Sequence, residues 1–350
     1  MRIVVLAGGI STERDVSISS GLLVAAALRE KGHQVVLLDV YTGYEHDIFD
    51  VDELFKQNYS FTEGIKVGET ISDISEIMEN RRDKSDRYIG ENVIDICSCA
   101  DITFLALHGG EGENGQIQAA FDLLGIKYTG SGYLGSALAM HKGFTKSVLI
   151  QNKILTPRGE IFDSPEEAFH WNIFPCVVKP CSGGSSVGIT IVHTPKEYRQ
   201  SVIEAFGYGE NEIVVEQYVK GREFSVGLLG GKALAPIEII PKGGFYDYKT
   251  KYQAGAAIEV CPADITEEED RAMREAAVKV YNALRLSSYA RVDFILDKGG
   301  NPYCLEANTL PGMTPTSLLP QEAKVEGMSY ADLCEKIIEI SLERYRKPEI

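Results

Sequence analysis

The chain has 350 residues, of which 44% are hydrophobic and 25% are charged, and its formal net charge is −16. This length suffices for two or three domains with their own cores, and the composition is typical of a globular protein. The negative charge excludes the broad basic surface that nucleic-acid binding requires, so an anionic ligand would need a local group of cations.

The chain carries no pattern typical of a membrane or secreted protein. No apolar run approaches the roughly 18 residues of a membrane span, and the apolar run in residues 1–9 is too short for a signal peptide. The seven cysteines are scattered, lack the pairwise spacing of a zinc site, and in several cases lie within apolar segments. We therefore expect a cytoplasmic protein with reduced thiols and no membrane partner.

The N-terminal part predicts the opening of an α/β fold. Residues 2–7 and 34–40 are predicted strands, and residues 17–31 form the amphipathic helix between them. Residues 101–107 form a third predicted strand, which precedes the glycine-rich segment 108–115 and a helix that ends at residue 124. This pattern predicts a doubly wound parallel sheet, which binds ligands beyond the carboxyl ends of its strands.

Two side chains are expected at those strand ends. Glu13 follows the Gly8-Gly9 turn at the start of a helix, where a carboxylate either complements the helix dipole or pairs with a substrate ammonium group. His108 occupies the equivalent position after the third strand, and it is either structural or close to a ligand.

Two segments differ from this simple pattern. Residues 44–91 are polar and mixed in charge, with one predicted helix at 74–81, and we interpret them as an insertion of unknown role. Residues 130–135 match G-x-G-x-x-G and lead into a predicted helix at 136–151. Because no acidic residue follows at the spacing of a nicotinamide site, we interpret these glycines as a turn.

The central part contains a candidate phosphate site. A predicted strand at 175–180 contains Lys179 and leads into the Gly/Ser-rich loop 181–188. Such a loop either forms an anion-binding nest beside the lysine or is a flexible hairpin loop, and it is not a Walker A loop. The remaining predicted elements are strands at 189–193, 212–219, 222–229 and 233–240 and helices at 195–206, 266–286 and 328–345.

Two further segments suit a nucleotide. The strand end 216–219 and Glu223 could hydrogen-bond a purine and a ribose, although an ordinary strand end has the same pattern. The loop 245–252 is aromatic and cationic. It is either a solvent-exposed loop or a cover that brings Lys251 to a phosphate and excludes water.

A predicted β-hairpin near the C-terminus carries the most informative pattern. Predicted strands at 290–296 and 302–307 flank a glycine-containing turn at 297–301. If Gly299-Gly300 is the loop, residues whose numbers sum to 599 lie opposite each other across the two strands.

This register places four polar residues on one face of the hairpin. Asp293 lies opposite Glu306, and Arg291 lies opposite Asn308. Carboxylate and amide oxygens suit Mg²⁺, and a neighbouring guanidinium suits developing negative charge. The alternative is a solvated hairpin face.

Taken together, eight segments in this order resemble the D-alanine–D-alanine ligases of the ATP-grasp superfamily. The segments are GGISTERDVS, LHGGEGENGQIQ, YTGSGYLGSALAMHK, VVKPCSGGSSVG, EQYVKGREFSV, FYDYKTKY, RVDF and LEANTLPGMTPTSLLP. The resemblance implies a three-domain ATP-grasp architecture of class α/β and α+β. The implied domains are an N-terminal domain at 1–130 with the insertion at about 44–91, a central ATP-binding domain at 131–220 and a C-terminal domain at 221–350.

The same resemblance implies an activity. A D-alanine–D-alanine ligase joins two D-alanines through an acyl phosphate at the expense of ATP, for peptidoglycan precursor synthesis. It implies ATP and Mg²⁺ or Mn²⁺ as cofactors, with two metal ions expected, and a homodimer.

The resemblance also implies roles for the matching residues. The nucleotide would be bound by Lys142, Lys179, Ser186, Glu216, Val219 and Glu223, with Lys251 at its terminal phosphate. The metal ions would be bound by Asp293, Glu306 and Asn308. The first D-alanine would be bound by Glu13, with Ser185, Tyr252 and His108 nearby. Arg291 and the Gly312 N–H would stabilise the oxyanion, and Ser317 and Leu318 would hold the carboxylate of the second D-alanine.

One departure and three alternatives stay open. The family usually carries Asp before the helix lysine, where this chain has His141 before Lys142. Tyr252 fits an amine-accepting ligase, yet D-serine as the second substrate is an alternative. So are another ATP-grasp carboxylate–amine ligase and a nucleotide-binding sensor that has lost its chemistry.

Overall fold

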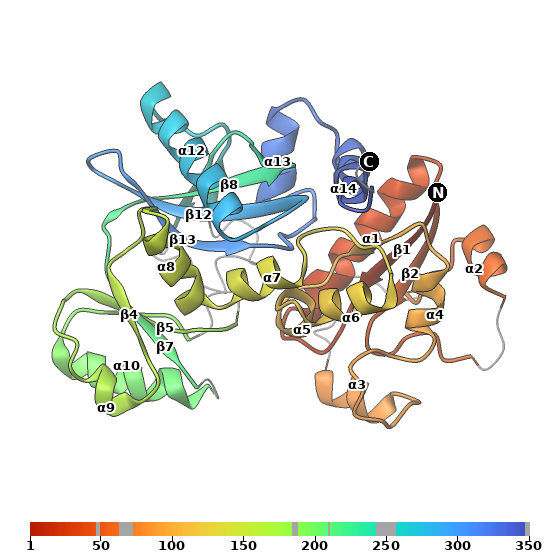
Figure 1. Ribbon diagram of the computed structural model, residues 1–350, viewed down its shortest axis with the longest axis horizontal. Helices are drawn as coiled ribbons and strands as arrows, with labels where there is room; N and C mark the ends of the chain where they lie inside the picture. Colours follow the sequence, from red (N-terminus) through yellow and green to blue (C-terminus); the bar gives the residue numbers. More distant parts are fainter. Residues whose placement is uncertain (47–49, 63–72, 184–187, 209–210, 243–256, 347–350) are drawn as a thin grey trace. The chain divides into compact units, whose positions relative to one another are not determined.

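The structure is a computed structural model that describes residues 1–46, 50–62, 73–183, 188–208, 211–242 and 257–346 (Figure 1). The chain divides into two compact units. Unit 1 comprises residues 1–133, 287–290 and 309–350, and unit 2 comprises residues 134–286 and 291–308.

Unit 1 is built on a parallel sheet in the order β2-β1-β3. The strands are β1 (Arg2–Ala7), β2 (Gln34–Asp39) and β3 (Ile102–Leu105), and both pairs are parallel. From Ile3 to Ala7, β1 is fully buried, which explains why its sequence is one unbroken apolar run. Helix α1 (Arg14–Glu30) connects β1 to β2 and packs against both strands and α14 (Tyr330–Glu343). The predicted parallel N-terminal sheet is therefore confirmed.

The segment 44–91 is attached to this sheet. It contains α2 (Val51–Gln57), which we did not predict, and α3 (Ile74–Asn80), which we did. Bridges from Leu37 to Ser60 and from Gly43 to Glu91 fasten it to β2 and to the turn after it. The other helices of unit 1 are α4 (Val93–Ser98), α5 (Gly110–Glu113), α6 (Gln116–Leu124) and α13 (Leu318–Val325).

The first sheet of unit 2 has four antiparallel strands in the order β4-β7-β5-β6. They are β4 (Gly159–Phe162), β5 (Cys176–Pro180), β6 (Thr190–Val192) and β7 (Ile213–Gln217). Helices α9 (Pro165–Ala168) and α10 (Pro195–Gly207) pack on this sheet (Figure 1). Trp171, Tyr198 and Val202 belong to the core between them.

The second sheet of unit 2 has the strand order β11-β10-β8-β12-β13, and β9 pairs with β8. Its strands are β8 (Gly221–Leu229), β9 (Lys232–Ala233), β10 (Ile237–Pro241), β11 (Ala257–Val260), β12 (Tyr289–Asp297) and β13 (Pro302–Asn308). Helix α12 (Glu267–Ala283) packs against β8, β9 and β13. Its N-terminus has a capping box between Thr266 and Glu269, as its acidic first turn suggests.

Two predicted elements were wrong in their continuity. The helix predicted at 136–151 is two helices, α7 (Tyr133–Met140) and α8 (Lys142–Gln151), because His141 adopts an extended conformation and caps α8. The strand predicted at 233–240 is interrupted between β9 and β10, where Pro236 offers no N–H for pairing. Elements β4, β11, α4, α5, α9 and α13 were not predicted.

The described residues also bear on the expectations about membrane spans and cysteines. Among their helices, none is both long and apolar enough to cross a membrane. All seven cysteines lie in the described part of the chain, and none of them forms a disulfide.

Candidate active site

The hairpin β12–β13 places the predicted metal-binding residues together in unit 2. Arg291 lies opposite Asn308 and Asp293 lies opposite Glu306, as predicted. Beyond this point the register shifts, because Phe294 pairs with Cys304 and Leu305 becomes an extra residue in β13.

The bulge at Leu305 offsets an error in the predicted turn. Leu296 pairs with Pro302, so the turn is centred on Gly299 and not on Gly299-Gly300. Asp297 stabilises this turn by accepting hydrogen bonds from the N–H groups of Gly299 and Asn301. The bulge then restores the predicted pairing at the four polar residues.

The carboxylate of Asp293 is held by two neighbours. The Arg291 guanidinium donates from Nε to Oδ1 at 2.9 Å and from its terminal nitrogen to Oδ2 at 2.8 Å. Ser225 on β8 donates to Oδ1 at 2.8 Å. Asp293 is 7% exposed, so its orientation is fixed within the sheet. Two carboxylates and an amide oxygen on one hairpin face fit the hard oxygen ligands of Mg²⁺.

A buried Lys–Glu–Lys group lies on the first sheet of unit 2. Val177 on β5 lies opposite Glu216 on β7, so Lys179 is the diagonal neighbour of Glu216 on the same face. The Nζ atom of Lys179 pairs with Oε2 of Glu216, and the Nζ atom of Lys146 on α8 lies 2.6 Å from Oε1. All three side chains are at least nine-tenths buried.

Burial and charge shape the protonation of this group. Burial lowers the pKa of Lys146, although Glu216 opposes that shift. Burial opposes ionisation of Glu216, yet the two ammonium groups outweigh it and lower the pKa of the carboxyl. The carboxylate therefore holds Lys179 in place as a charged pair.

Lys146 belongs to this buried group, and the sequence reasoning missed it. It follows Lys142 by four residues on α8, and this spacing puts both lysines on one face of the helix. The spacing could have indicated that Lys146 lies close to the residues around Lys142. Lys146 also donates to the Pro157 carbonyl at 2.6 Å, so its position is fixed independently of Glu216.

Lys142 connects α8 to the start of the Gly/Ser-rich loop. Its backbone N–H donates to the Cys181 carbonyl at 2.8 Å, and its Nζ donates to the Gly183 carbonyl at 2.7 Å. Val219 follows β7, and Glu223 lies on β8 opposite Ile239. Four predicted site residues lie outside the described part of the chain: Ser185, Ser186, Lys251 and Tyr252.

In unit 1, Glu13 and His108 lie at the carboxyl ends of β1 and β3. Glu13 is the N-cap residue of α1, and a Cβ added to Gly109 would be 2.9 Å from its Oε2. The Ser11 hydroxyl donates to the His108 carbonyl at 2.6 Å, and His108 Nε2 lies 3.2 Å from the Ser20 hydroxyl. The loops that follow β1 and β3 are therefore joined by short contacts.

The remaining three predicted residues also belong to unit 1. Ser317 is the N-cap residue of α13 and Leu318 is its first residue, a position that favours a bound carboxylate. A Cβ on Gly312 would be 2.8 Å from the Ser317 hydroxyl oxygen, so the two approach closely. The Met313 N–H donates to Ser20 at 3.4 Å, so Ser20 contacts both this segment and His108. Ser20 carried no signal in the sequence.

The described site residues therefore sort into two sets. The set assigned to the amino-acid substrates lies in unit 1: Glu13, His108, Ser317 and Leu318. Gly312, one of the two predicted oxyanion donors, also lies in unit 1. The set assigned to nucleotide, metal and oxyanion lies in unit 2: Lys142, Lys179, Glu216, Val219, Glu223, Arg291, Asp293, Glu306 and Asn308. The individual roles stay predictions.

Two family models match the chain. Residues 2–131 match the model described as "D-ala D-ala ligase N-terminus", and residues 147–339 match "D-ala D-ala ligase C-terminus". Both lie in the order that the sequence motifs indicate.

Curated relatives and solved structures match over nearly the full length. The D-alanine–D-alanine ligase of Pediococcus pentosaceus is 44% identical over 345 residues, covering 97% of each chain. That of Lacticaseibacillus casei is 43% identical over 349 residues, covering 99% of this chain and 97% of the relative. The crystal structure of the Bacillus anthracis ligase complexed with ATP has a TM-score of 0.72 at 29% identity and covers 98% of both chains. The Coxiella burnetii ligase has a TM-score of 0.74 at 26% identity and covers 99% of this chain and 94% of that one.

Proposed function

Because the chain belongs to the D-alanine–D-alanine ligase family, we propose the following roles for its residues in the joining of two D-alanines. The protein is an ATP-dependent, ADP-forming ligase of ATP-grasp fold that makes D-alanyl-D-alanine for peptidoglycan precursors. The observation that supports the residue roles best is the hairpin pairing of Asp293 with Glu306 and of Arg291 with Asn308.

The residues of unit 2 bind the nucleotide and the metal. ATP supplies the phosphoryl group that turns the first carboxylate into an acyl phosphate. Asp293, Glu306 and Asn308 would hold Mg²⁺, which would offset the negative charge of the phosphoryl group during its transfer. Lys142 and Lys179 are point charges for phosphate oxygens, and the pair with Glu216 keeps Lys179 oriented. These lysines provide the local positive charge that an acidic protein needs for such a ligand.

The residues of unit 1 bind the amino acids. Glu13 accepts the ammonium group of the first D-alanine, with His108 nearby, since both lie at the ligand-binding edge of a parallel sheet. The Ser317 hydroxyl and the Leu318 N–H hold the carboxylate of the second D-alanine at the N-terminus of α13.

The oxyanion that forms when the second amine attacks needs donors. Arg291 is one, because its guanidinium is already aligned beside the metal ligands. The Gly312 N–H is the other. Ser185, Ser186, Lys251 and Tyr252 keep their assigned roles in this proposal, which rest on the family resemblance. We also propose a division into domains at about residues 130 and 220, a second metal ion and a homodimer, and these too rest on the family resemblance. A cytoplasmic location is supported by the need for ATP.

The proposal is tested by phosphate release from ATP and Mg²⁺ over a panel of D- and L-amino acids and D-lactate. We expect release with D-alanine alone and a product whose mass is that of D-alanyl-D-alanine. Mixed incubation with D-serine identifies the second substrate from the product mass. Release with another pair, and none with D-alanine, would overturn the substrate assignment.

A further inference from the structure

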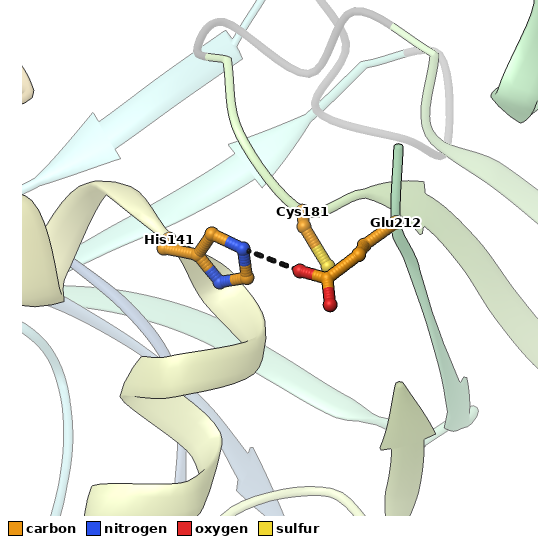
Figure 2. A group of neighbouring side chains, drawn as sticks. All are labelled: His141, Cys181 and Glu212. Atoms are coloured by element: carbon orange, nitrogen blue, oxygen red, sulfur yellow. Dashed lines mark hydrogen bonds and ion pairs between the residues drawn. The ribbon is translucent and has the colours of Figure 1, made fainter. Parts of the chain in front are cut away.

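Three side chains of unit 2 to which the proposed function assigns no role converge at one point. His141 precedes α8, Cys181 follows β5 and Glu212 precedes β7, and Figure 2 shows the three pointing toward one another. One ligand atom from each lies within 4.8 Å of the others. His141 Nε2 and Glu212 Oε2 lie 2.9 Å apart.

An imidazole nitrogen, a sulfur and a carboxylate oxygen are a ligand set for Zn²⁺. Zinc takes all three at about 2.0–2.3 Å in a tetrahedron, whose ligand atoms are about 3.5 Å apart. The side chains therefore need to close by roughly an ångström to enclose the ion. The thiol disfavours Mg²⁺, which takes oxygen ligands, so this cluster is chemically distinct from the hairpin site.

The cluster is accessible from one side. A hollow of about 480 Å³ is lined by His141, Asp163, Ser182, Asn211 and Glu212. The Glu212 side chain is 38% exposed, whereas Cys181 is 1% exposed and lies deeper. An ion arriving through the hollow meets the carboxylate first, and Asp163 or a water molecule can supply the fourth ligand.

We propose that His141, Cys181 and Glu212 form a Zn²⁺ site. His141 Nδ1 accepts a hydrogen bond from the Phe144 N–H at 3.2 Å, so its ring proton is assigned to Nε2 and faces Glu212. Zinc binding at Nε2 moves that proton to Nδ1 and releases the thiol proton of Cys181, so one proton leaves for each ion bound.

Zinc binding has a consequence for the neighbouring lysine. With a proton on Nδ1, His141 no longer accepts the Phe144 N–H and the cap of α8 is lost. Helix α8 begins with Lys142, whose N–H bonds to the Cys181 carbonyl. The metal therefore changes two neighbours of Lys142: His141, which caps α8, and Cys181, whose carbonyl accepts the Lys142 N–H. We infer that the nucleotide then binds more weakly. This inference rests on the role proposed above for Lys142.

The site is tested by titrating the metal-free full chain with Co²⁺ and displacing it with Zn²⁺. We expect one equivalent of Co²⁺ to give a thiolate charge-transfer absorption that Zn²⁺ abolishes, with one proton released by calorimetry in two buffers. Cys181→Ser should remove the band, and His141→Asn, which can still cap α8, should weaken Zn²⁺ binding at least about 100-fold. Cys99→Ser is the matched control, because Cys99 is exposed and lies in unit 1.

A band that survives Cys181→Ser, or one that Cys99→Ser removes, would overturn the site. The coupling is tested separately with a fluorescent ATP analogue in saturating Mg²⁺. Zinc should weaken its binding by a factor of about five, the effect of a lost helix cap, and should have no effect in Cys181→Ser. Zinc binding without this change would overturn the coupling alone. Failure of the analogue to bind in the absence of zinc would count against the proposed function instead.

Discussion

Replacing Glu216 with Gln removes the negative charge that Lys146 and Lys179 share inside unit 2. The carboxylate is 3% exposed, and both of its oxygens pair with an ammonium group. Removing one partner of a buried ion pair costs about 3–5 kcal/mol, because the other charge is left uncompensated. The Gln oxygen can still accept one hydrogen bond, so we expect a loss of about 3 kcal/mol.

The sign of the pH dependence follows from the lowered pKa of Glu216. A carboxyl whose pKa is lower in the folded state stabilises the fold above its unfolded pKa, and this contribution is lost as the pH falls through the folded value. The ordinary value is 4.5, so the difference between the native protein and Glu216→Gln should be complete near neutral pH and should shrink below 4.5.

Urea unfolding followed by tryptophan fluorescence measures this loss. Trp171 is the chain's one tryptophan, and it lies in the core of the same sheet. A loss of about 3 kcal/mol lowers the urea midpoint by roughly 1 M or more. Glu160→Gln is the matched control, because Glu160 is an exposed carboxylate on the neighbouring strand β4. Equal midpoints for the two variants would refute the buried-pair reasoning.

Five further substitutions test other parts of the structure. Asp293→Ala and Glu306→Ala should each lower Mg²⁺-dependent phosphate release at least about 100-fold while the Trp171 unfolding transition persists, and near-normal release would remove the metal assignment of the hairpin. His141→Ala should cost about 1 kcal/mol of stability and His141→Asp close to none, because Asp also caps a helix; equal losses in thermal unfolding would contradict the cap. Gly109→Ala places a Cβ 2.9 Å from Glu13 Oε2 at a φ of +71°. It should therefore raise the KM for D-alanine in steady-state kinetics, and an unchanged KM would argue against Glu13 as the ammonium partner.

The fold was predictable wherever a single periodicity governs a segment. A strand buried on both faces has an unbroken apolar run, as β1 does, and a helix buried on one face has an amphipathic pattern, as α1 does. These two patterns predicted both elements. Helix α8 shows where this reasoning fails. The apolar pattern continues through His141, and only the capping bond to Phe144 reveals that the helix restarts there.

The candidate site divides in the same way. Paired positions on the hairpin were predictable, since strand register follows from a short turn. The contact between Lys146 and Glu216 was not, because it depends on how α8 packs on a sheet. Ser20 was missed for the same reason, since its partners His108 and Met313 are distant in sequence. His141 itself caps α8 by accepting the Phe144 N–H at Nδ1, so the start of this helix needs no Asp at that position.

Because of the bulge at Leu305, the register at the four polar residues of the hairpin differs from the register next to its turn. The turn and the first three pairs follow one register, and the pairing of Asp293 with Glu306 follows another. If the first register continued without a bulge, Leu305 would lie opposite Asp293, and Glu306 would point to the other face of the sheet. Deleting Leu305 would place Glu306 directly after Cys304 and opposite Asp293 in one continuous register, so this deletion should keep the four polar residues paired. What matters for the polar face is therefore the sum of two lengths, that of the turn and that of the segment between Cys304 and Glu306, because together they determine which residue lies opposite Asp293.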